Sequence, residues 1–558
     1  MNRFTPPGPG VWERESVHTM RPISRAHAAV FPDAVNAGFR WSMKRYGFLL
    51  EGMEFQVVNR YIYTCIRPVG APKGAKGPPP KLILKLMLLL HPEMRRRLRR
   101  IREVWATKAW REDVAIWDNE WKPQILRENT ELQRVDVAAL DLDAFITHLE
   151  RCYDTAARAV YRHHSLNGTA LLPLGDFLVH VKAWTGLPPS EVLPLFRGSS
   201  RVSQGAVLEL DALVAAMQSN PDAMLLLAGS DAAAVLEALT ARADEVGKTA
   251  RGYVDAAGIR IATGYDFADV SLAEMPELLV ENIRSALTGG SGTTENDVAR
   301  REAALREQVP SEHRQQFDEL LAEARYTYRI RDERAYLNDA WACGIARKAI
   351  LEAGRRLVAA GKLHQADHAV ELTPAEIVSM LRGGNDRTAD QAAADALFRA
   401  THTIHDAPEH LGGTPAGPPP PEWLPPAAAR AERAIGIVLG EMFVTRATRK
   451  GDFSVSGFAA SPGEIVGTAR LVLDPHDMGR IQKGDVLITR ATAPSYNALL
   501  PLLSGIVTDR GGTLSHAAVV AREYGIPAVV GCGNATELIK DGMRVRVNGT
   551  TGAVEILA

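Results

Sequence analysis

The stretch TDRGGTLSHAAVVARE, residues 508–523, decides how the C-terminal part of this chain folds. Two glycines precede small hydroxyl residues and a single histidine, His516, and a run typical of a helix follows. This order predicts that His516 lies in the first turn of a helix that begins after a glycine-containing loop. Short strand-like segments separated by glycine turns surround the stretch, so we expect a C-terminal α/β module.

A histidine in that position is suited to carry a phosphoryl group. The first N–H groups of a helix have no internal partner and carry the positive end of the helix dipole, so they stabilise an anion. We expect Gly511 and Gly512 to keep the approach open, and Thr513 and Ser515 to supply hydroxyl donors and capping oxygens. The imidazole of His516 is predicted to stay exposed.

Arg522 follows His516 by less than two helical turns, where its guanidinium group is expected to reach a phosphate. An alternative interpretation is a helix-capping loop that contains a histidine without chemical use. The sequence around the loop is needed to distinguish a phosphoryl-carrying histidine from a helix cap.

The rest of the chain indicates a multidomain protein. Residues 81–382 are dominated by long amphipathic helical patterns, for example Asp332 to Gly361, and Phe55 to Tyr63 are strand-like. A loop is expected at residues 288–293, and a stiff connector at residues 412–426. The predicted architecture is a mostly α-helical N-terminal body plus a C-terminal α/β domain. The predicted domain ranges are 1–390, 391–452 (a Pro-rich linker and a helix) and 453–558.

Composition excludes several classes of function. The chain has 558 residues and a formal net charge of −1, so no overall attraction to nucleic acid or to an anionic membrane is expected. Its four cysteines lack paired spacing, which favours reduced thiols in a cytoplasm over disulfides or a zinc site. The sequence therefore predicts a cytoplasmic protein with no metal site, no nucleic-acid partner and no membrane partner.

The C-terminal stretch resembles a known family. Residues 511–531 are similar to the phosphohistidine swivelling domain of the phosphoenolpyruvate (PEP)-utilising enzymes, and this β/β/α resemblance extends over residues 453–558 through ASPG (460–463), KGD (483–485) and ATAP (491–494). It implies that His516 is the residue that is phosphorylated. One position departs from the family, because Leu514 stands where the PEP synthase and the dikinase carry a threonine that can be phosphorylated.

The helical body has a less specific resemblance to the middle region of rifampin-type and phenylphosphate-synthase-type enzymes. In that family this region binds the acceptor. Arg260 is expected to neutralise the moving phosphoryl group, and Asp266 to orient or deprotonate an acceptor hydroxyl. Ile259 replaces a histidine that is usual in the family. A buried Arg260–Asp266 pair that ties helices together is an equally open interpretation.

A second group of candidate acceptor-site residues surrounds a predicted turn at Asn167. A histidine with a pKa near neutrality can act as a general base toward a hydroxyl. The alternative is that these residues cap helices or line the core. The group consists of His163, His164, Asp176 and His180.

The resemblance also implies how the protein is organised. No part of the chain resembles the ATP-grasp nucleotide domain, and no barrel domain follows His516, so we expect a split enzyme. In this hypothesis a separate ATP-grasp subunit binds ATP and magnesium and phosphorylates His516, and this chain passes the phosphoryl group to a phenol or another small alcohol. It is then a dikinase-type phosphotransferase with no cofactor of its own. The alternatives are a non-catalytic phosphohistidine carrier or regulatory partner, half of a rifampin-type phosphotransferase, and a PEP synthase-like protein.

Overall fold

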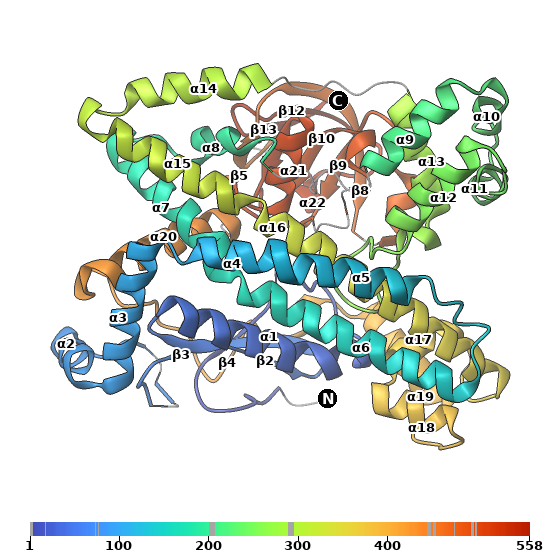
Figure 1. Ribbon diagram of the computed structural model, residues 1–558, viewed down its shortest axis with the longest axis horizontal. Helices are drawn as coiled ribbons and strands as arrows, with labels where there is room; N and C mark the ends of the chain where they lie inside the picture. The colour runs from blue at the N-terminus through green and yellow to red at the C-terminus, as the bar shows by residue number, and fades with distance from the viewer. Residues whose placement is uncertain are drawn as a thin grey trace. The chain divides into compact units, whose positions relative to one another are not determined.

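The computed structural model describes residues 4–16, 18–72, 74–75, 77–199, 207–287, 295–443, 448–449, 454–473, 475–492, 496 and 499–557. By contact the chain divides into two compact units (Figure 1). Unit 1 consists of Met1–Asp176, Tyr265–Ala268 and Leu337–Ile435. Unit 2 consists of Phe177–Gly264, Asp269–Tyr336 and Gly436–Ala558.

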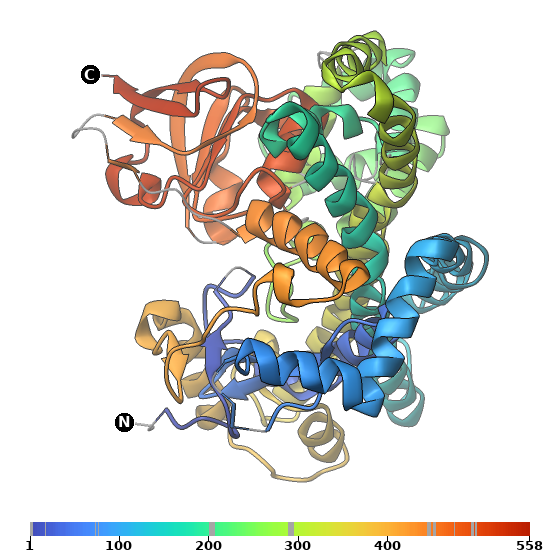
Figure 2. The same ribbon diagram turned by 90° about the vertical axis from the view of Figure 1, so that its left-hand side faces the viewer.

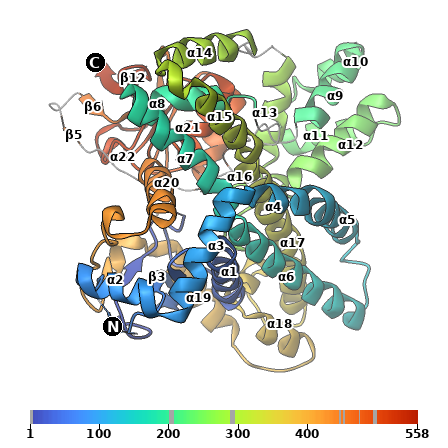
Figure 3. The same ribbon diagram turned by 60° about the vertical axis from the view of Figure 1, so that its left-hand side comes forward.

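Unit 1 is built mainly from helices around the pair α1 and α6, which lie side by side (Figures 1 and 3). Gly38 on α1 allows this close approach, because a Cβ atom there would lie 2.6 Å from the backbone oxygen of Tyr161 on α6. The helices of this unit are α1 (Arg25–Tyr46), α2 (Lys81–Leu90), α3 (Pro92–Thr107), α4 (Trp110–Ile116), α5 (Lys122–Gln133), α6 (Leu142–Ser165), α17 (Trp341–Ala359), α18 (Pro374–Leu381) and α19 (Ala389–Thr401).

A small antiparallel sheet of order β2-β3-β1-β4 packs in the same unit. Its strands are β1 (Trp12–Arg14), β2 (Leu50–Val58), β3 (Tyr61–Pro68) and β4 (His410–Leu411). The single strand expected at Phe55 to Tyr63 is wrong, because the chain turns back at Asn59 and Arg60. These two residues have φ angles of 48° and 74°, the left-handed backbone that a two-residue hairpin turn requires.

The helix expected from Asp332 to Gly361 is present but is not uniform. It consists of α16 (Ile330–Glu333), a π-helical segment η6 (Arg334–Ala340) and α17. A π-helical segment places an extra residue in the turn and rotates the side chains that follow, and such segments are frequent at functional sites.

Most helices of unit 2 precede its sheet in the chain. They are α8 (Pro189–Val192), α9 (Val207–Gln218), α10 (Pro221–Leu226), α11 (Ala232–Thr240), α12 (Glu245–Gly258), α13 (Pro276–Leu287), α14 (Glu295–Gln308) and α15 (Arg314–Tyr328). Two further helices cross from one unit to the other along the chain. These are α7 (Asn167–Thr185) and α20 (Pro426–Phe443).

The C-terminal module, residues 454–557, carries most of a nine-stranded sheet of order β5-β6-β13-β12-β8-β9-β10-β11-β7 (Figure 2, orange to red). The strands β8, β9, β10 and β11 are parallel neighbours, and the outer strands pair antiparallel. The elements are β5 (Thr448–Arg449), β6 (Ser454–Ser456), β7 (Phe458–Ser461), β8 (Glu464–Val472), β9 (Asp485–Thr489), β10 (Leu503–Thr508), α21 (His516–Tyr524), β11 (Ala528–Val530), α22 (Ala535–Leu538), β12 (Arg544–Asn548) and β13 (Ala553–Leu557).

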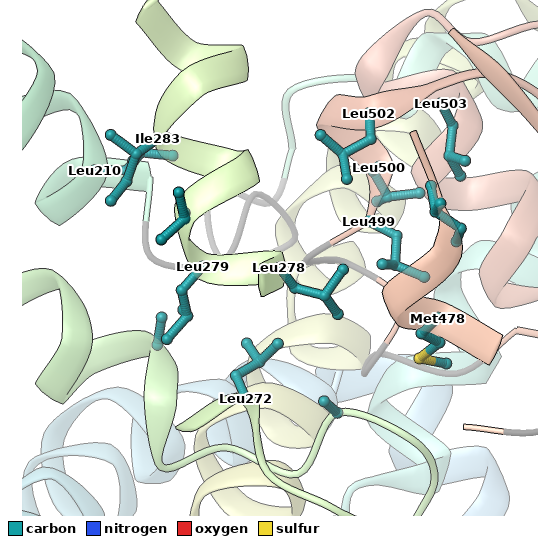
Figure 4. Packing of buried hydrophobic residues seen from close by; sticks show 14 of the residues in the cluster. Leu210, Leu272, Leu278, Leu279, Ile283, Met478, Leu499, Leu500, Leu502 and Leu503 are labelled. Carbon is teal, nitrogen blue, oxygen red and sulfur yellow. The ribbon is translucent and has the colours of Figure 1, made fainter. Parts of the chain in front are cut away.

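Two apolar clusters hold unit 2 together. One lies inside the module and includes Val486, Val507 and Val545. The other joins the module to the helices that precede it, and Figure 4 shows Leu278 of α13 on the side of Met478 and Leu499. The predicted fold class, a mostly helical body followed by a C-terminal α/β domain, is confirmed by this architecture.

The predicted domain division stays a prediction. It has the ranges 1–390, 391–452 and 453–558, whereas contacts between residues divide the chain into two discontinuous units. The loop expected at residues 288–293, and residues 450–453 at the predicted start of the last domain, lie outside the described residues. Among the described residues, no helix is both long enough and apolar enough to cross a membrane.

Candidate phosphohistidine site

His516 is the first residue of α21, which connects the parallel strands β10 and β11. The loop 509–515 leaves the carboxyl end of β10, the edge of a parallel sheet at which ligands usually bind. Ser515 is the N-cap residue of α21, and its carbonyl accepts from Val519 N at 3.0 Å to begin the helix. The first turn of α21 therefore presents unpaired backbone N–H groups beside His516.

The two glycines serve local geometry. Gly511 has a φ of +99°, and a Cβ atom there would lie 2.6 Å from the Cβ of Ser515. A Cβ atom on Gly512 would lie 2.3 Å from the backbone oxygen of Glu441, at the end of α20. That oxygen also accepts from Leu514 N at 2.8 Å. Because Gly512 has no side chain, the backbone of α20 can approach the loop and bond to it. The sequence did not indicate this contact.

The two nitrogens of the His516 imidazole have different surroundings. Nδ1 lies 2.9 Å from the hydroxyl of Thr492, within hydrogen-bond distance. Nε2 is shielded from solvent and has no hydrogen-bond partner in the described part of the chain. The predicted exposed imidazole is therefore wrong for this structure, since the ring is half-buried. When Nδ1–H donates to Thr492, Nε2 carries the lone pair and is the nitrogen that can act as a nucleophile.

Burial, with the nearby positive charge of Arg331 as the second cause, lowers the pKa of His516 to about 3. Arg331 belongs to α16 and donates from Nη2 to the carbonyl of Leu514 at 3.0 Å. Its Nη1 is buried and has no hydrogen-bond partner among the residues described. The sequence prediction missed Arg331, which lies 185 positions before His516 and belongs to no motif that we recognised.

The hydroxyl groups of the loop differ from the expectation. The Ser515 side chain makes no capping hydrogen bond, and its Oγ is buried without a partner in the described part of the structure. The Thr513 hydroxyl donates to the carboxylate of Glu441. Thr513 therefore helps α20 to hold the loop, whereas Ser515 Oγ is available to a ligand at the helix start.

Arg522 lies in the second half of α21, where it is buried. Its Nη1 donates to the carbonyl of Ala460 on β7 at 2.9 Å. Burial lowers the pKa of Arg522, and a hydrogen bond with Tyr328 opposes that shift. In this structure Arg522 thus ties α21 to β7 and α15.

Glu523 follows Arg522 and is also buried. Burial raises the pKa of Glu523 to about 7, although its carboxylate accepts from the backbone N of Gly198 at 2.9 Å. The last turn of α21 therefore carries an acid that titrates near neutral pH.

The geometry agrees with a comparison of this chain with protein families. The family model described as PEP-utilising enzyme, mobile domain, matches residues 481–552. Residues 481–552 of the C-terminal module are therefore similar to the mobile domain of the PEP-utilising enzymes. This confirms the family resemblance that the residues around His516 carry.

Curated relatives match only part of this chain. Rifampicin phosphotransferase of Bacillus cereus is 47% identical over 104 residues, which cover 19% of this chain and 12% of that relative. A probable phosphoenolpyruvate synthase of Staphylothermus marinus is 48% identical over 102 residues, 18% of this chain and 12% of the relative. The uncharacterised phosphotransferase YvkC of Bacillus subtilis is 26% identical over 318 residues, 56% of this chain and 36% of the relative. The matched part of the chain thus spans about an eighth to about a third of these relatives.

The candidate acceptor residues Arg260 and Asp266 belong to different units, so the structure describes each with its own neighbours. Arg260 is buried in unit 2, with its guanidinium carbon 4.2 Å from the ring centroid of Tyr336. Asp266 in unit 1 accepts from Ser24 N at 2.7 Å and from Ala268 N at 2.8 Å. Burial opposes ionisation of Asp266, but His27 and these hydrogen bonds leave its pKa lowered.

His163 and His164 lie at the end of α6 in unit 1, with ring centroids 4.8 Å apart. Nδ1 of His163 lies 2.6 Å from a carboxylate oxygen of Asp339 in η6. His164 stacks on Phe39 of α1 at a centroid distance of 5.0 Å. The sequence prediction missed Asp339 as a member of this group, because it follows His163 by 176 positions.

Asp176 and His180 have other partners. The carboxylate of Asp176 accepts two hydrogen bonds from Arg430 of α20, at 2.8 Å and 2.6 Å. His180 lies against Trp184, one turn further along α7, with ring centroids 5.4 Å apart. In the part of the chain that the structure describes, no three His, Cys, Asp or Glu residues form a group that could hold a metal ion.

Proposed function

We propose that this chain is a phosphotransferase that carries a phosphoryl group on Nε2 of His516. The observation that carries the proposal is the unpartnered Nε2 of an imidazole with a lowered pKa, at the start of α21. A neutral imidazole whose other nitrogen is held by Thr492 is ready to act as a nucleophile. Nucleophilic histidines of this kind divide one transfer into two easier steps.

The surroundings of Nε2 support an anion. The unpartnered Nη1 of Arg331 and Oγ of Ser515 are donors near the helix start, and the N–H groups of the first turn add the positive end of the α21 dipole. A phosphoryl group on Nε2 would satisfy the orphaned donors and neutralise part of the positive charge. Nη1 of Arg522 donates to Ala460, so Arg522 supports the helix, whereas its Nη2 is a further buried donor without a hydrogen-bond partner among the described residues.

The donor is proposed to be ATP with magnesium, bound on a separate ATP-grasp subunit. In this dikinase-type reaction the β-phosphoryl group passes to His516, leaving AMP and inorganic phosphate. The relatives named rifampicin phosphotransferase and phosphoenolpyruvate synthase support phosphoryl transfer in general. A rifampin-type or PEP synthase-like reaction is the second candidate, because relatives with these names match part of this chain.

The acceptor is proposed to be a phenol or another small alcohol bound in the helical body. Asp266, His163 and His164 are the sequence-predicted residues that lie in unit 1 beside other ionisable groups. Arg260, Asp176 and His180 are held in other surroundings. A carrier that passes its phosphate to another protein, without an acceptor site of its own, is the alternative.

The first experiment is phosphorylation with ATP labelled separately at the β and γ positions, in the presence of a candidate ATP-grasp subunit. We expect acid-labile label from the β position on His516, located by mass spectrometry under alkaline conditions. His516→Ala should carry none, and the matched variant His364→Ala, which removes a histidine paired with exposed Asp390, should be labelled normally.

A His516→Ala chain that still accepts β label would overturn the proposal. Label from the γ position alone would contradict the dikinase-type reaction. Adding phenol to the labelled chain then separates an enzyme from a carrier, since label that never leaves His516 for any hydroxyl compound supports the carrier alternative.

A further inference from the structure

The helix α2 in unit 1 exposes a contiguous apolar surface. Five of its ten residues are large aliphatic side chains that are between 50% and 79% exposed, namely Leu82, Ile83, Leu86, Leu89 and Leu90. Among the described residues, no other helix exposes more than two large apolar side chains. Single exposed apolar residues are ordinary, but a contiguous group marks a surface that binds a partner.

The exposed stripe lies opposite the side of α2 that packs on its own unit. Leu84 and Leu88 are buried in an apolar cluster with residues of α3. At about 3.6 residues per turn, Leu82, Leu86 and Leu89 fall on the other side of the helix. A helix that is apolar on all sides is normally buried. The outward side of α2 is therefore available for a contact outside unit 1.

Positive charge borders this stripe. Lys81 and Lys85 lie along one edge of it, because their helical angle falls between those of the buried and the exposed leucines. The next helix, α3, lies beside α2 (Figures 1 and 3) and exposes Arg95, Arg99 and Arg102 on a stripe of its own. In the described part of the chain, none of these five basic side chains has an ion-pair partner.

The charge of this region differs from that of the whole chain. Residues 81–107 contain eight Lys or Arg residues and two Glu residues, a formal charge of +6, whereas the whole chain carries −1. Both glutamates already pair with arginines of α3. The surface is therefore complementary to an anionic partner. The prediction that the protein has no membrane partner rested on the net charge, which does not reveal a local patch.

The composition of the surface distinguishes the possible partners. A second copy in a symmetric dimer would bring the same basic patch against itself, and like charges would repel. The cores of protein interfaces are enriched in aromatic residues and depleted in Lys, whereas the exposed residues of α2 are Leu, Ile and Lys. Leucines bordered by lysines, whose ammonium groups can stay in water, are typical of a helix in a lipid interface.

We propose that these five aliphatic and five basic side chains, the α2–α3 surface, bind the protein to an anionic lipid bilayer. The helix α2 would lie in the membrane plane, with its outward leucines between the lipid head groups and the acyl chains. The arginines of α3 would contact the lipid phosphates. Because apolar insertion and positive charge act together, the binding is reversible but specific for anionic lipid. It requires no phosphoryl group on His516, so the inference is independent of the proposed function.

The binding test sediments the full chain with vesicles of phosphatidylcholine alone or mixed in equal amounts with phosphatidylglycerol. We expect saturable binding to the mixed vesicles and binding to phosphatidylcholine alone that is weaker by about tenfold or more. Leu86→Gln combined with Leu89→Gln should weaken binding to mixed vesicles by about tenfold or more. The matched control is Leu142→Gln combined with Leu397→Gln, which changes two exposed leucines on α6 and α19 and should bind as wild type does.

A second pair of variants tests the charge. Arg95→Gln combined with Arg99→Gln should weaken binding to the mixed vesicles by about tenfold or more at low salt, and added salt should weaken wild-type binding. The control is Arg127→Gln combined with Arg151→Gln, which removes two exposed charges on α5 and α6. An equal loss in both double variants would contradict a defined docking surface.

A fluorescent label tests whether α2 itself enters the lipid. All four cysteines of the chain are buried, so a cysteine introduced at the surface can be labelled selectively. A polarity-sensitive dye on Leu89→Cys should shift its emission to shorter wavelength when mixed vesicles are added. The same dye on Leu397→Cys should not shift. Bound protein that shows no shift at Leu89→Cys would overturn the proposal.

The other possible partners give different results. Wild-type chain that stays in solution with the mixed vesicles would overturn the proposal and leave an acidic protein as the partner. Equal binding by wild type and by Leu86→Gln combined with Leu89→Gln would show that another surface binds the lipid. A wild-type dimer that the same double variant converts to a monomer would assign the stripe to a second copy, and would also overturn the proposal.

Discussion

At the scale of single residues, the environment of His516 favours a nucleophile over an acid. An ordinary histidine is partly protonated near neutral pH, and its protonated form cannot attack phosphorus. Burial and Arg331 shift the equilibrium of His516 toward the neutral form. If His516 accepts a phosphoryl group as proposed, the positive charge of Arg331 would also stabilise that group.

The first prediction concerns the protonation of His516. The folded pKa of His516, about 3, lies below the ordinary histidine value of 6.5, so the unfolded chain binds a proton more readily between these two values. This residue therefore contributes stability that is present above about pH 6.5 and is lost as the pH falls toward 3. Histidine NMR should show a neutral His516 at pH 5. A His516 midpoint near 6.5 would contradict the buried environment.

The second prediction concerns Gly512. Gly512→Ala should displace the loop and lower stability by about 1–3 kcal/mol, because the new Cβ would lie 2.3 Å from the Glu441 oxygen. Gly436→Ala on α20 is the matched control, since nothing lies within 4 Å of its Cβ position. That control should be neutral or stabilise the helix by up to about 1 kcal/mol. Chemical denaturation of the two variants measures the difference.

The sequence predicted part of this site for clear physical reasons. Glycines, small hydroxyl residues and a histidine before a helical run are local signals, and they located His516 correctly at the start of α21. Thr492, Arg331 and Glu441 reach the loop from other segments, and no periodicity connects them to it. The burial of Nε2 is a result of tertiary packing, so local sequence could not indicate it.

At the scale of elements, the packing of α1 on α6 positions the candidate acceptor residues His163 and His164. The two helices approach closely at Gly38, next to His164. The π-helical turn in η6 precedes α17 and includes Asp339. Helical periodicity indicated both α6 and the helix after Asp332, but an extra residue in one turn leaves the apolar pattern nearly unchanged, so the sequence did not reveal η6.

The third prediction tests this helix pair. Gly38→Ala should lower the free energy of unfolding by about 1–3 kcal/mol, because its Cβ would lie 2.6 Å from the Tyr161 oxygen and 2.8 Å from the His164 Cβ. Chemical denaturation measures the change. Gly252→Ala in α12, where nothing lies within 4 Å, is the control for helix propensity. A Gly38→Ala chain as stable as wild type would argue against close α1–α6 packing.

The fourth prediction concerns α21 and its last turn. The folded pKa of Glu523, about 7, is raised above its ordinary value of 4.5. The folded chain therefore binds the extra proton, and the contribution of Glu523 to stability falls as the pH rises from about 4.5 to 7. Glu523→Gln removes that contribution while keeping an oxygen for Gly198. The free energy of unfolding of each protein is measured as a function of pH. The difference, wild type minus Glu523→Gln, should fall as the pH rises from about 4.5 to 7. A difference that does not change with pH would contradict the raised pKa.

At the scale of the whole molecule, neither compact unit is a continuous piece of chain. Composition and periodicity predicted a helical body before an α/β module, which is what the fold shows. They could not indicate that Phe177–Gly264 and Asp269–Tyr336 belong with the mobile domain. That grouping depends on apolar contacts between α13 and residues near Leu499, and residues so far apart leave no local pattern.

The fifth prediction concerns the mobile domain expressed alone as residues 454–558. The fragment keeps its internal cluster around Val507 but loses the partners of Met478, Leu499 and Leu503. We expect strand content by circular dichroism, together with dye binding to exposed apolar surface and a tendency to associate. The full chain should show neither dye binding nor association. If the fragment is monomeric and binds no dye, the domain that follows the predicted boundary at residue 453 folds on its own.

The grip of α20 on the phosphohistidine loop has a mechanical consequence. Gly512 and Leu514 donate to the last turn of α20, and Thr513 holds the carboxylate of Glu441, so that turn moves with the loop as one rigid body. A hinge between Glu441 and the loop would break these hydrogen bonds. Any movement of His516 that keeps these hydrogen bonds therefore requires a hinge that precedes Glu441 in the chain.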